Sequence, residues 1–87
     1  MEITEVRVFP VEGDGRLKAY ATIVFDSEFI IRDLKIIGGD TGLFVSMPSR
    51  RRKDGSFRDI VHPLNQEMRN KLESDVIKEY NKVASSI

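Results

Sequence analysis

The sequence contains neither cysteine nor tryptophan, and it has a single histidine, His62. The lack of cysteine excludes a disulfide framework and a thiolate metal site, and one histidine is too few for a histidine-based metal site. No apolar run approaches the length of a membrane span, and the first residues lack the basic and apolar regions of a signal peptide. We therefore expect a cytoplasmic protein with no cofactor, no metal and no membrane contact.

The chain also lacks net charge, because 14 basic residues balance 14 acidic ones. The charges are nevertheless segregated: residues 1–46 carry a net charge of −3, residues 47–71 carry +4 and residues 72–87 carry −1. A balanced total argues against a protein that coats nucleic acid indiscriminately. The basic middle segment fits a protein that touches a polyanion with one face, although chance also produces such a distribution.

The chain of 87 residues is long enough for one domain, which we expect to span residues 1–87. Alternating apolar and polar residues and the turn residues between them predict several short strands. In the third of these we expect Ile30, Leu34 and Ile36 to share one face. Tight connections are expected at 12–15, 26–27 and 38–42. The predicted strands cover about 2–11, 17–25, 29–37, 43–47 and 57–61.

The apolar period changes after Pro63. Asn65 is a suitable N-cap, and apolar residues at helical spacing predict a helix from about 66 to 84. The stripe comprises Met68, Leu72, Val76, Ile77, Tyr80 and Val83. The fold class expected is therefore α+β: an antiparallel meander sheet of about five strands, followed by one long C-terminal helix packed on it.

One helix is too small to cover both faces of such a sheet. Apolar sheet surface should remain exposed around Phe29, Ile31, Ile37 and Phe44. Because a large exposed apolar surface commonly marks a contact between subunits, we expect a homodimer.

The segment 42–63 is the most informative part of the sequence. It reads GLFVSMPSRRRKDGSFRDIVHP, which is a strand, a proline, a run of four cations, a turn and a second strand. This order predicts a hairpin with the four cations at its tip, where they can neutralise backbone phosphates. A solvated hairpin tip without a binding role is the alternative. The four cations are Arg50, Arg51, Arg52 and Lys53.

The same segments resemble the stage V sporulation protein G family, also called SpoVG or the septation protein family. The resemblance runs almost from end to end of the chain. The pair GLFVSMPS and FRDIVHP, separated by a short DG turn, is its most specific part. The other matching segments are ITEVRV, GRLKAYATI, FIIRDLKII and MRNKL.

This resemblance implies a small, cytoplasmic, dimeric bacterial regulator that binds DNA and, in some members, RNA. It also implies links to asymmetric septation, to sporulation and to the control of gene expression. The family's sequence-discriminating contacts lie near the start of the long helix, where this chain has Arg69 and Lys71. The basic loop here has more charge and one proline fewer than is common in the family, which favours phosphate affinity.

The predicted nucleic-acid-binding residues have structural alternatives. Arg58 is also placed to pair with Asp59 or with a carboxylate across the hairpin, and Lys71 with Glu67. For Phe44 and Phe57, core packing is favoured over base stacking, and His62 is expected to be a hydrogen-bonded structural residue. The complete predicted set is Arg50, Arg51, Arg52, Lys53, Arg58, Arg69 and Lys71.

The sequence thus predicts a dimeric nucleic-acid-binding regulator. The alternative is a protein-interaction module of the division machinery that does not bind nucleic acid itself. We expect no enzymatic activity and no small-molecule substrate, because no nucleophile and base occur at a recognisable spacing.

Overall fold

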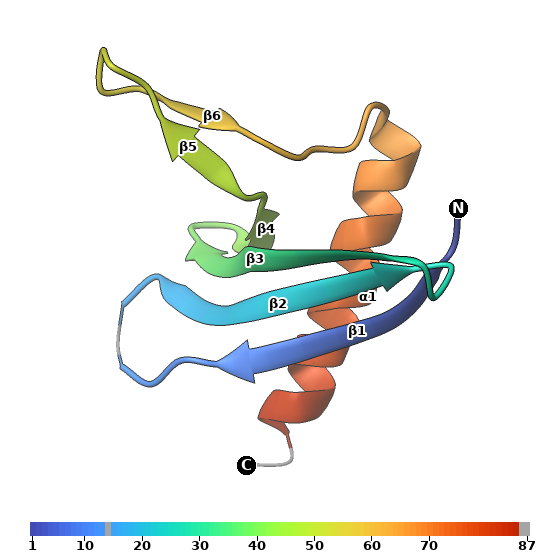
Figure 1. Cartoon of the computed structure of the whole chain (residues 1–87). Helices are drawn as coiled ribbons and strands as arrows, with labels where there is room; N and C mark the ends of the chain where they lie inside the picture. Colours follow the sequence, from blue (N-terminus) through green and yellow to red (C-terminus); the bar gives the residue numbers. More distant parts are fainter. Residues whose placement is uncertain (14, 86–87) are drawn as a thin grey trace.

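The computed structural model describes residues 1–13 and 15–85 (Figure 1). Its main sheet is antiparallel and has the strand order β1-β2-β3-β4. A separate two-stranded sheet pairs β5 with β6, and helix α1 follows. The α+β class is thus confirmed. Asp14, which belongs to the turn expected at 12–15, lies outside the described residues. The elements are β1 (Ile3–Pro10), β2 (Leu17–Phe25), β3 (Phe29–Gly39), β4 (Gly42–Ser46), β5 (Ser49–Arg51), β6 (Phe57–Asp59) and α1 (Gln66–Ala84).

The antiparallel sheet and the helix packed on it are as predicted, but the main sheet has four strands rather than about five. The main sheet ends at Ser46, and the second hairpin forms its own small sheet instead of extending the first. Two neighbouring residues explain the break. Met47 is buried in the core, which commits the chain to turn inward, and Pro48 has no N–H to donate to a continuing ladder. The strand predicted at 57–61 accordingly ends at Asp59.

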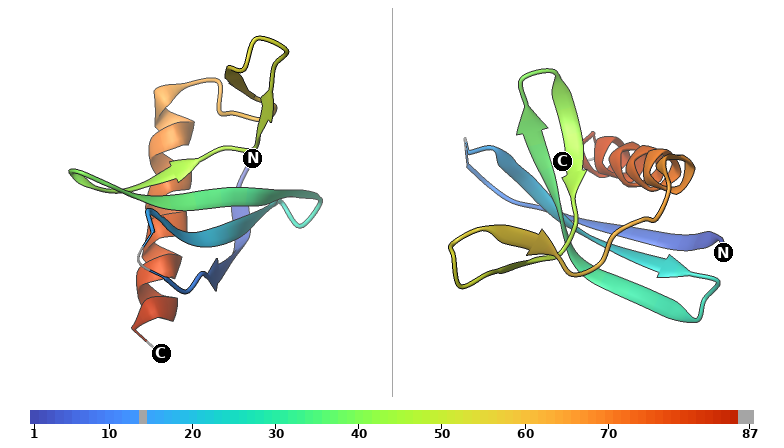
Figure 2. Two further views of the ribbon diagram at one scale, coloured as in Figure 1. Left: turned by 90° about the vertical axis from the view of Figure 1, so that its left-hand side faces the viewer. Right: turned by 90° about the horizontal axis from the view of Figure 1, so that it is seen from above.

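The core lies between one face of the main sheet and helix α1. The sheet contributes Ala19, Ala21 and Ile23 from β2, which are fully buried, and α1 contributes Leu72 and Val76. The other apolar residues of the predicted helix stripe pack around this centre, so the stripe is confirmed as core. Figure 2 shows α1 running across one side of the twisted sheet.

The face predicted for β3 was partly wrong, because β3 contains a β-bulge. Ala21 pairs with Leu34 and Ile23 pairs with Ile31, so β3 has one residue more than β2 between these pairs. Asp33 lies in this stretch with φ 66°, a conformation that Asp tolerates better than most residues. The extra residue reverses the alternation, so Leu34 faces the core while Ile30 is exposed.

The predicted tight connection at 26–27 and the predicted N-cap are both confirmed. Asp26 and Ser27 have positive φ angles, as the central residues of a type I′ turn require, and the Glu28 N–H donates to the Phe25 carbonyl (2.9 Å). At the start of α1, the Asn65 side chain accepts a hydrogen bond from the Met68 N–H (2.7 Å).

The second face of the main sheet is not covered by α1. It presents Phe9, Tyr20, Ile30 and Phe44, each 40–52% exposed. Phe9 pairs with Tyr20, and Phe44 pairs with Ile37, so the apolar side chains are cross-strand neighbours. We call this surface the open sheet face. Of the four residues predicted to be left exposed, Phe29 and Phe44 are exposed and Ile31 and Ile37 are half-buried. The strand register places Ile37 and Phe44 on the open sheet face and Phe29 and Ile31 on the helix side.

No helix among the described residues has both the length and the apolar character needed to cross a membrane.

A hydrogen bond joins α1 to the edge of the main sheet. The Glu73 carboxylate accepts from the backbone N–H of Val45, an edge-strand residue that is only 2% exposed (3.1 Å). This bond satisfies a buried donor for which the sheet has no further strand.

Removing this acceptor should destabilise the fold. We expect Glu73→Ala to lower the free energy of unfolding by about 1.5–3 kcal/mol, because it leaves the Val45 N–H buried and unpaired. Glu73→Gln keeps an acceptor oxygen and should cost about half as much. Urea denaturation measures both, with Ser74→Ala as a control at an exposed helix position. Equal losses for the Ala and Gln variants would show that the hydrogen bond does not contribute.

Candidate nucleic-acid interface

The basic segment forms a hairpin that stands away from the main sheet, on the other side of it from α1 (Figure 2). Ser49 pairs with Asp59, Arg50 with Arg58, and Arg51 with Phe57. We call residues 49–59 the basic hairpin. The Arg52 N–H donates to the Ser56 carbonyl (2.7 Å), which leaves Lys53, Asp54 and Gly55 as the loop. Gly55 has φ 92°, as expected for the left-handed position of a three-residue loop.

Asp54 holds this loop together. Its carboxylate accepts two hydrogen bonds from Ser56, one from the hydroxyl (2.6 Å) and one from the backbone N–H (2.9 Å). These bonds favour the charged form and lower the pKa of Asp54 below its ordinary value, the hydroxyl bond being the larger cause. The acidic residue at the tip is therefore engaged with its own turn.

The prediction that all four consecutive cations lie at the tip was only partly right. Arg50 and Arg51 belong to strand β5, whereas Arg52 and Lys53 lie at the turn. The ladder places Arg50 directly opposite Arg58. Like charges in a cross-strand pair are unfavourable, so this pairing reduces the stability of the hairpin.

The cations of the basic hairpin have no acidic partners among the residues that the structure describes. The ion pairs of that part of the chain join Arg7 to Glu5 (2.7 Å) and Lys71 to Asp75 (3.2 Å). The alternative pairing of Arg58 with Asp59 therefore does not form. The five cations line one shallow concave surface together with Asp59 and Ile60; they are Arg50, Arg51, Arg52, Lys53 and Arg58.

The structure brings one of the two predicted helix cations to the basic hairpin. Arg69 is half-buried on the first turns of α1 and lines a depression with Phe57, Arg58, Asp59 and His62. We call this the Phe57 depression. Arg58 lines both this depression and the concave surface of the hairpin cations. The two surfaces are therefore adjacent, and together they extend from the hairpin to Arg69 on α1.

Lys71 lies elsewhere. It borders a different depression near Asn65 and Glu67, and its ammonium group pairs with Asp75, one helical turn further on, rather than with Glu67. The predicted residues therefore form one group of six cations, with Lys71 outside it.

Among the side chains beside the cations, the prediction for Phe57 was wrong and the prediction for His62 agrees with the structure. Phe57 was predicted to pack in the core, but its side chain is 71% exposed. His62 hydrogen-bonds the Pro63 carbonyl oxygen through Nδ1 (3.1 Å), as expected for a structural role. The alternation of strand residues alone could not reveal the exposure of Phe57, because it depends on the hairpin leaving the sheet.

The basic hairpin has no core of its own. Every residue from 49 to 60 is exposed, and the hairpin is anchored by buried Met47 before it and half-buried Val61 after it. A two-stranded ribbon without packing partners is marginally stable in water. The hairpin is thus a support for charged side chains rather than a part of the packed domain.

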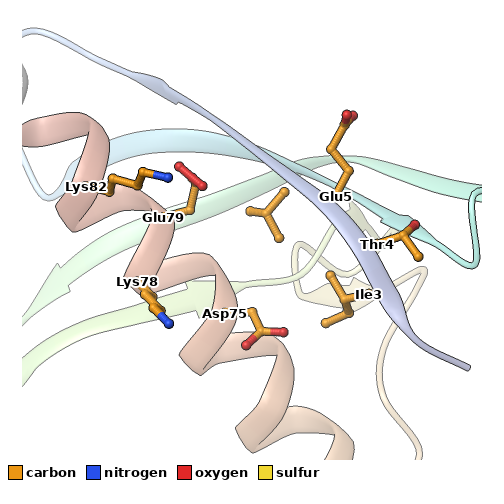
Figure 3. Close-up of a pocket in the computed structure, with 8 residues that line it drawn as sticks. Ile3, Thr4, Glu5, Asp75, Lys78, Glu79 and Lys82 are labelled. Carbon is orange, nitrogen blue, oxygen red and sulfur yellow. The ribbon is translucent and has the colours of Figure 1, made fainter.

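Other concave surfaces of the described chain are poorer candidates for binding a polyanion. A depression between β1 and α1 is bordered by three carboxylates, of Glu5, Asp75 and Glu79, and by Lys78 and Lys82 (Figure 3). Its mixed charge does not favour phosphate.

The second surface is a cleft of about 270 Å³ next to the start of α1. Its walls are almost entirely apolar side chains, and it has few groups that could orient a ligand. The apolar side chains of the walls include Phe25, Phe29, Ile31, Met47, Met68 and Leu72.

Comparison with known proteins identifies the family. The model of the SpoVG family matches residues 1–82. The chain belongs to the SpoVG family. A protein named "Putative septation protein SpoVG" from Anaeromyxobacter sp. (strain K) is 60% identical over 82 residues, which cover 94% of this chain and 80% of that protein.

Proteins of the same name show that the likeness extends across distant organisms. The one from Bdellovibrio bacteriovorus is 56% identical over 87 residues, covering 100% of this chain and 80% of its own length. The one from Archaeoglobus fulgidus is 53% identical over 79 residues, covering 91% and 93%. The SpoVG match includes the main sheet, the basic hairpin and the start of α1.

The acid response of the hairpin loop can be predicted from Asp54. The pKa of this carboxyl is lower in the folded hairpin than in an unfolded chain. The carboxylate therefore stabilises the loop fully at pH values above the pKa that Asp54 has in the unfolded chain. This contribution should disappear as the pH falls through the lowered pKa. An NMR titration of the Asp54 carboxyl and the Ser56 amide measures the transition. Ser56→Ala, which removes the larger of the two causes, should raise the Asp54 pKa; an unchanged value would show that the hydroxyl bond is not formed.

Proposed function

We propose that this SpoVG-family chain is a dimeric, non-enzymatic regulator that binds nucleic acid through the basic hairpin and Arg69. The names of its relatives associate it with septation, and binding to nucleic acid is a means by which a small protein can control expression of the division or sporulation machinery. In this function the chain first binds the phosphate backbone. Limited sequence preference would come from Arg69, because an arginine on the first turns of a helix can reach base edges as well as phosphates.

The observation that supports this proposal most directly is the unfavourable pairing of Arg50 with Arg58. Two arginines face each other on a hairpin that has no hydrophobic packing, and neither has an acidic partner in the described chain. A like-charge pair costs stability unless a bound anion neutralises it. Phosphates placed between such strands would relieve the repulsion and release counterions, which provides a salt-dependent affinity.

The open sheet face supports the dimeric part of the proposal. Its aromatic and aliphatic side chains leave exposed apolar surface on a chain of only 87 residues. Small domains gain considerably from covering such surface with a second copy. A two-fold pair of chains would present two basic hairpins, so that a few cations on each chain would suffice for useful affinity.

The same face supports a second candidate function, a protein-interaction module of the septation machinery that does not bind nucleic acid. In that case the open sheet face would receive another protein, and the basic hairpin would be a solvated projection. A division protein that remains bound after nuclease treatment and in high salt would favour this candidate.

Loss of hairpin charge should weaken binding to all sequences alike. For Arg50→Ala combined with Arg58→Ala, we expect a lower affinity and a flatter dependence on salt. The slope of log Kd against log salt should fall by about 0.9 for each duplex phosphate that the variant no longer neutralises, or about 0.7 for a single strand. Fluorescence anisotropy of labelled DNA and RNA at several salt concentrations measures both quantities.

Two controls make this experiment specific. Arg32→Ala with Lys78→Ala removes the same charge from exposed sites away from the hairpin and should leave the slope unchanged. Arg58→Glu should weaken binding while stabilising the hairpin by roughly 0.2–1 kcal/mol, because it creates an opposite-charge pair with Arg50. Wild-type binding by the double alanine variant at every salt concentration would rule out the phosphate role.

A charge on the open sheet face should separate the subunits. We expect the wild-type chain to sediment as a dimer and Phe44→Glu combined with Tyr20→Glu to sediment as a monomer, because two carboxylates would be buried without partners. Analytical ultracentrifugation measures the mass. Ile60→Glu is the matched control, since Ile60 is 63% exposed but lies outside this face. A double variant that remains dimeric would show that another surface joins the subunits.

A further inference from the structure

Phe57 is an aromatic side chain that the fold leaves mostly exposed. It occupies a strand position, yet it is 71% exposed, and its cross-strand neighbour is Arg51 rather than an apolar residue. Isolated apolar side chains are common on protein surfaces and usually require no explanation. Phe57 differs because three members of the cation group lie beside it: Arg51, Arg58 and Arg69.

The Phe57 depression combines groups from two separate elements. Phe57, Arg58 and Asp59 come from β6, Arg69 comes from α1, and His62 lies in the connection between them. A flat apolar ring is thus bordered by a cation from the hairpin and by a cation from the helix. Aromatic rings beside a cationic track are the elements that proteins use to hold unpaired bases.

We propose that the Phe57 depression binds single-stranded nucleic acid, with an unpaired base stacked on the Phe57 ring and the flanking phosphates held by Arg58 and Arg69. This inference rests on the proposed function and specifies its substrate. A duplex would not use the ring in this way, because its bases are already stacked and offer only their edges. An unstacked base has a free face, and every base has one.

Asp59 supports a base rather than a phosphate as the group inside the depression. Its carboxylate lines the same surface and repels an anion placed there, whereas it accepts hydrogen bonds from the amino groups of bases. The phosphates therefore belong on the arginine-lined borders.

The composition of the hairpin tip argues against an anionic membrane as the ligand. The tip consists of Arg52, Lys53, Asp54 and Gly55, with no apolar side chain to enter the lipid. Phe57 lies on the strand behind the tip and in a depression, where a single base reaches it more readily than a flat lipid surface.

The absence of tryptophan from the chain provides a direct test. Phe57→Trp introduces a single tryptophan at the proposed stacking position, and stacking of a base quenches its fluorescence. We expect saturable quenching by a 12-nucleotide single strand, as DNA or RNA, and little quenching by the matching duplex. Phe44→Trp, on the open sheet face, is the control and should not be quenched. Stronger quenching by RNA than by DNA of the same sequence would identify the 2′-hydroxyl as an additional contact.

Affinity provides the second measurement. Phe57→Ala should weaken single-strand binding by about 5- to 100-fold, the range typical of one stacked base, and should change duplex binding much less. Phe57→Tyr retains a ring and should bind nearly as the wild type does. Because Phe57 is not part of the core, the alanine variant should fold normally, which circular dichroism verifies.

The outcomes separate this inference from the proposed function. If Phe57→Ala binds single strands as tightly as the wild type does, while Arg50→Ala with Arg58→Ala binds weakly, the stacking site is wrong and the phosphate-binding role stands. If the wild-type chain binds neither single strands nor duplexes at low salt, both are wrong. Quenching or a blue shift of the introduced tryptophan by vesicles of equal phosphatidylcholine and phosphatidylglycerol, without a response to nucleic acid, would overturn the inference in favour of a membrane surface.

Discussion

The packing of helix α1 on one face of the main sheet is the interaction on which the rest of this structure depends. Leu72 and Val76 on α1 complete a core to which all four strands of the main sheet contribute, with the fully buried Ala19, Ala21 and Ile23 of β2 among its members. Within the described chain no second helix is available to cover the other face. The core therefore lies on one side of the sheet only. As a result, the open sheet face remains exposed and the basic hairpin has no core against which to pack.

The basic hairpin shows the consequence of leaving the core. Once Met47 is buried and Pro48 has interrupted the ladder, the chain makes a ribbon in which every residue from 49 to 60 is exposed. Because these side chains do not pack in a core, many of them can be cationic. Two of the cations, Arg50 and Arg58, even occupy opposite positions in the ladder. Such an arrangement reduces local stability, and functional surfaces commonly carry such costs.

Membership of the SpoVG family joins these physical features to a biological setting. The match covers the sheet, the hairpin and the start of α1, so the same architecture underlies relatives named as septation proteins. The fold itself does not specify a function; the function has to be argued from the site. Here the candidate site is a set of cations from the basic hairpin and α1, two of which lie beside one exposed aromatic ring.

The sequence by itself determined the local structure of this protein. The i, i+4 stripe and Asn65 predicted α1 with its correct ends, and the alternation in 17–25 predicted β2, because these features depend on neighbouring residues alone. The resemblance of the sequence to SpoVG also led to the correct family. Most cations of the candidate site were also predicted from the sequence, because a run of consecutive arginine and lysine residues can be recognised without knowledge of the fold.

Only the tertiary structure decided how these parts meet. The bulge at Asp33 reversed one face of β3, and the break at Met47 and Pro48 separated the hairpin from the sheet. Together with the path of 60–65, that break brought Arg69 to Phe57 and Arg58 while Lys71 remained apart, paired with Asp75. The physical reason is that side-chain periods describe one element at a time. The relation between elements depends on which residues the single core could bury.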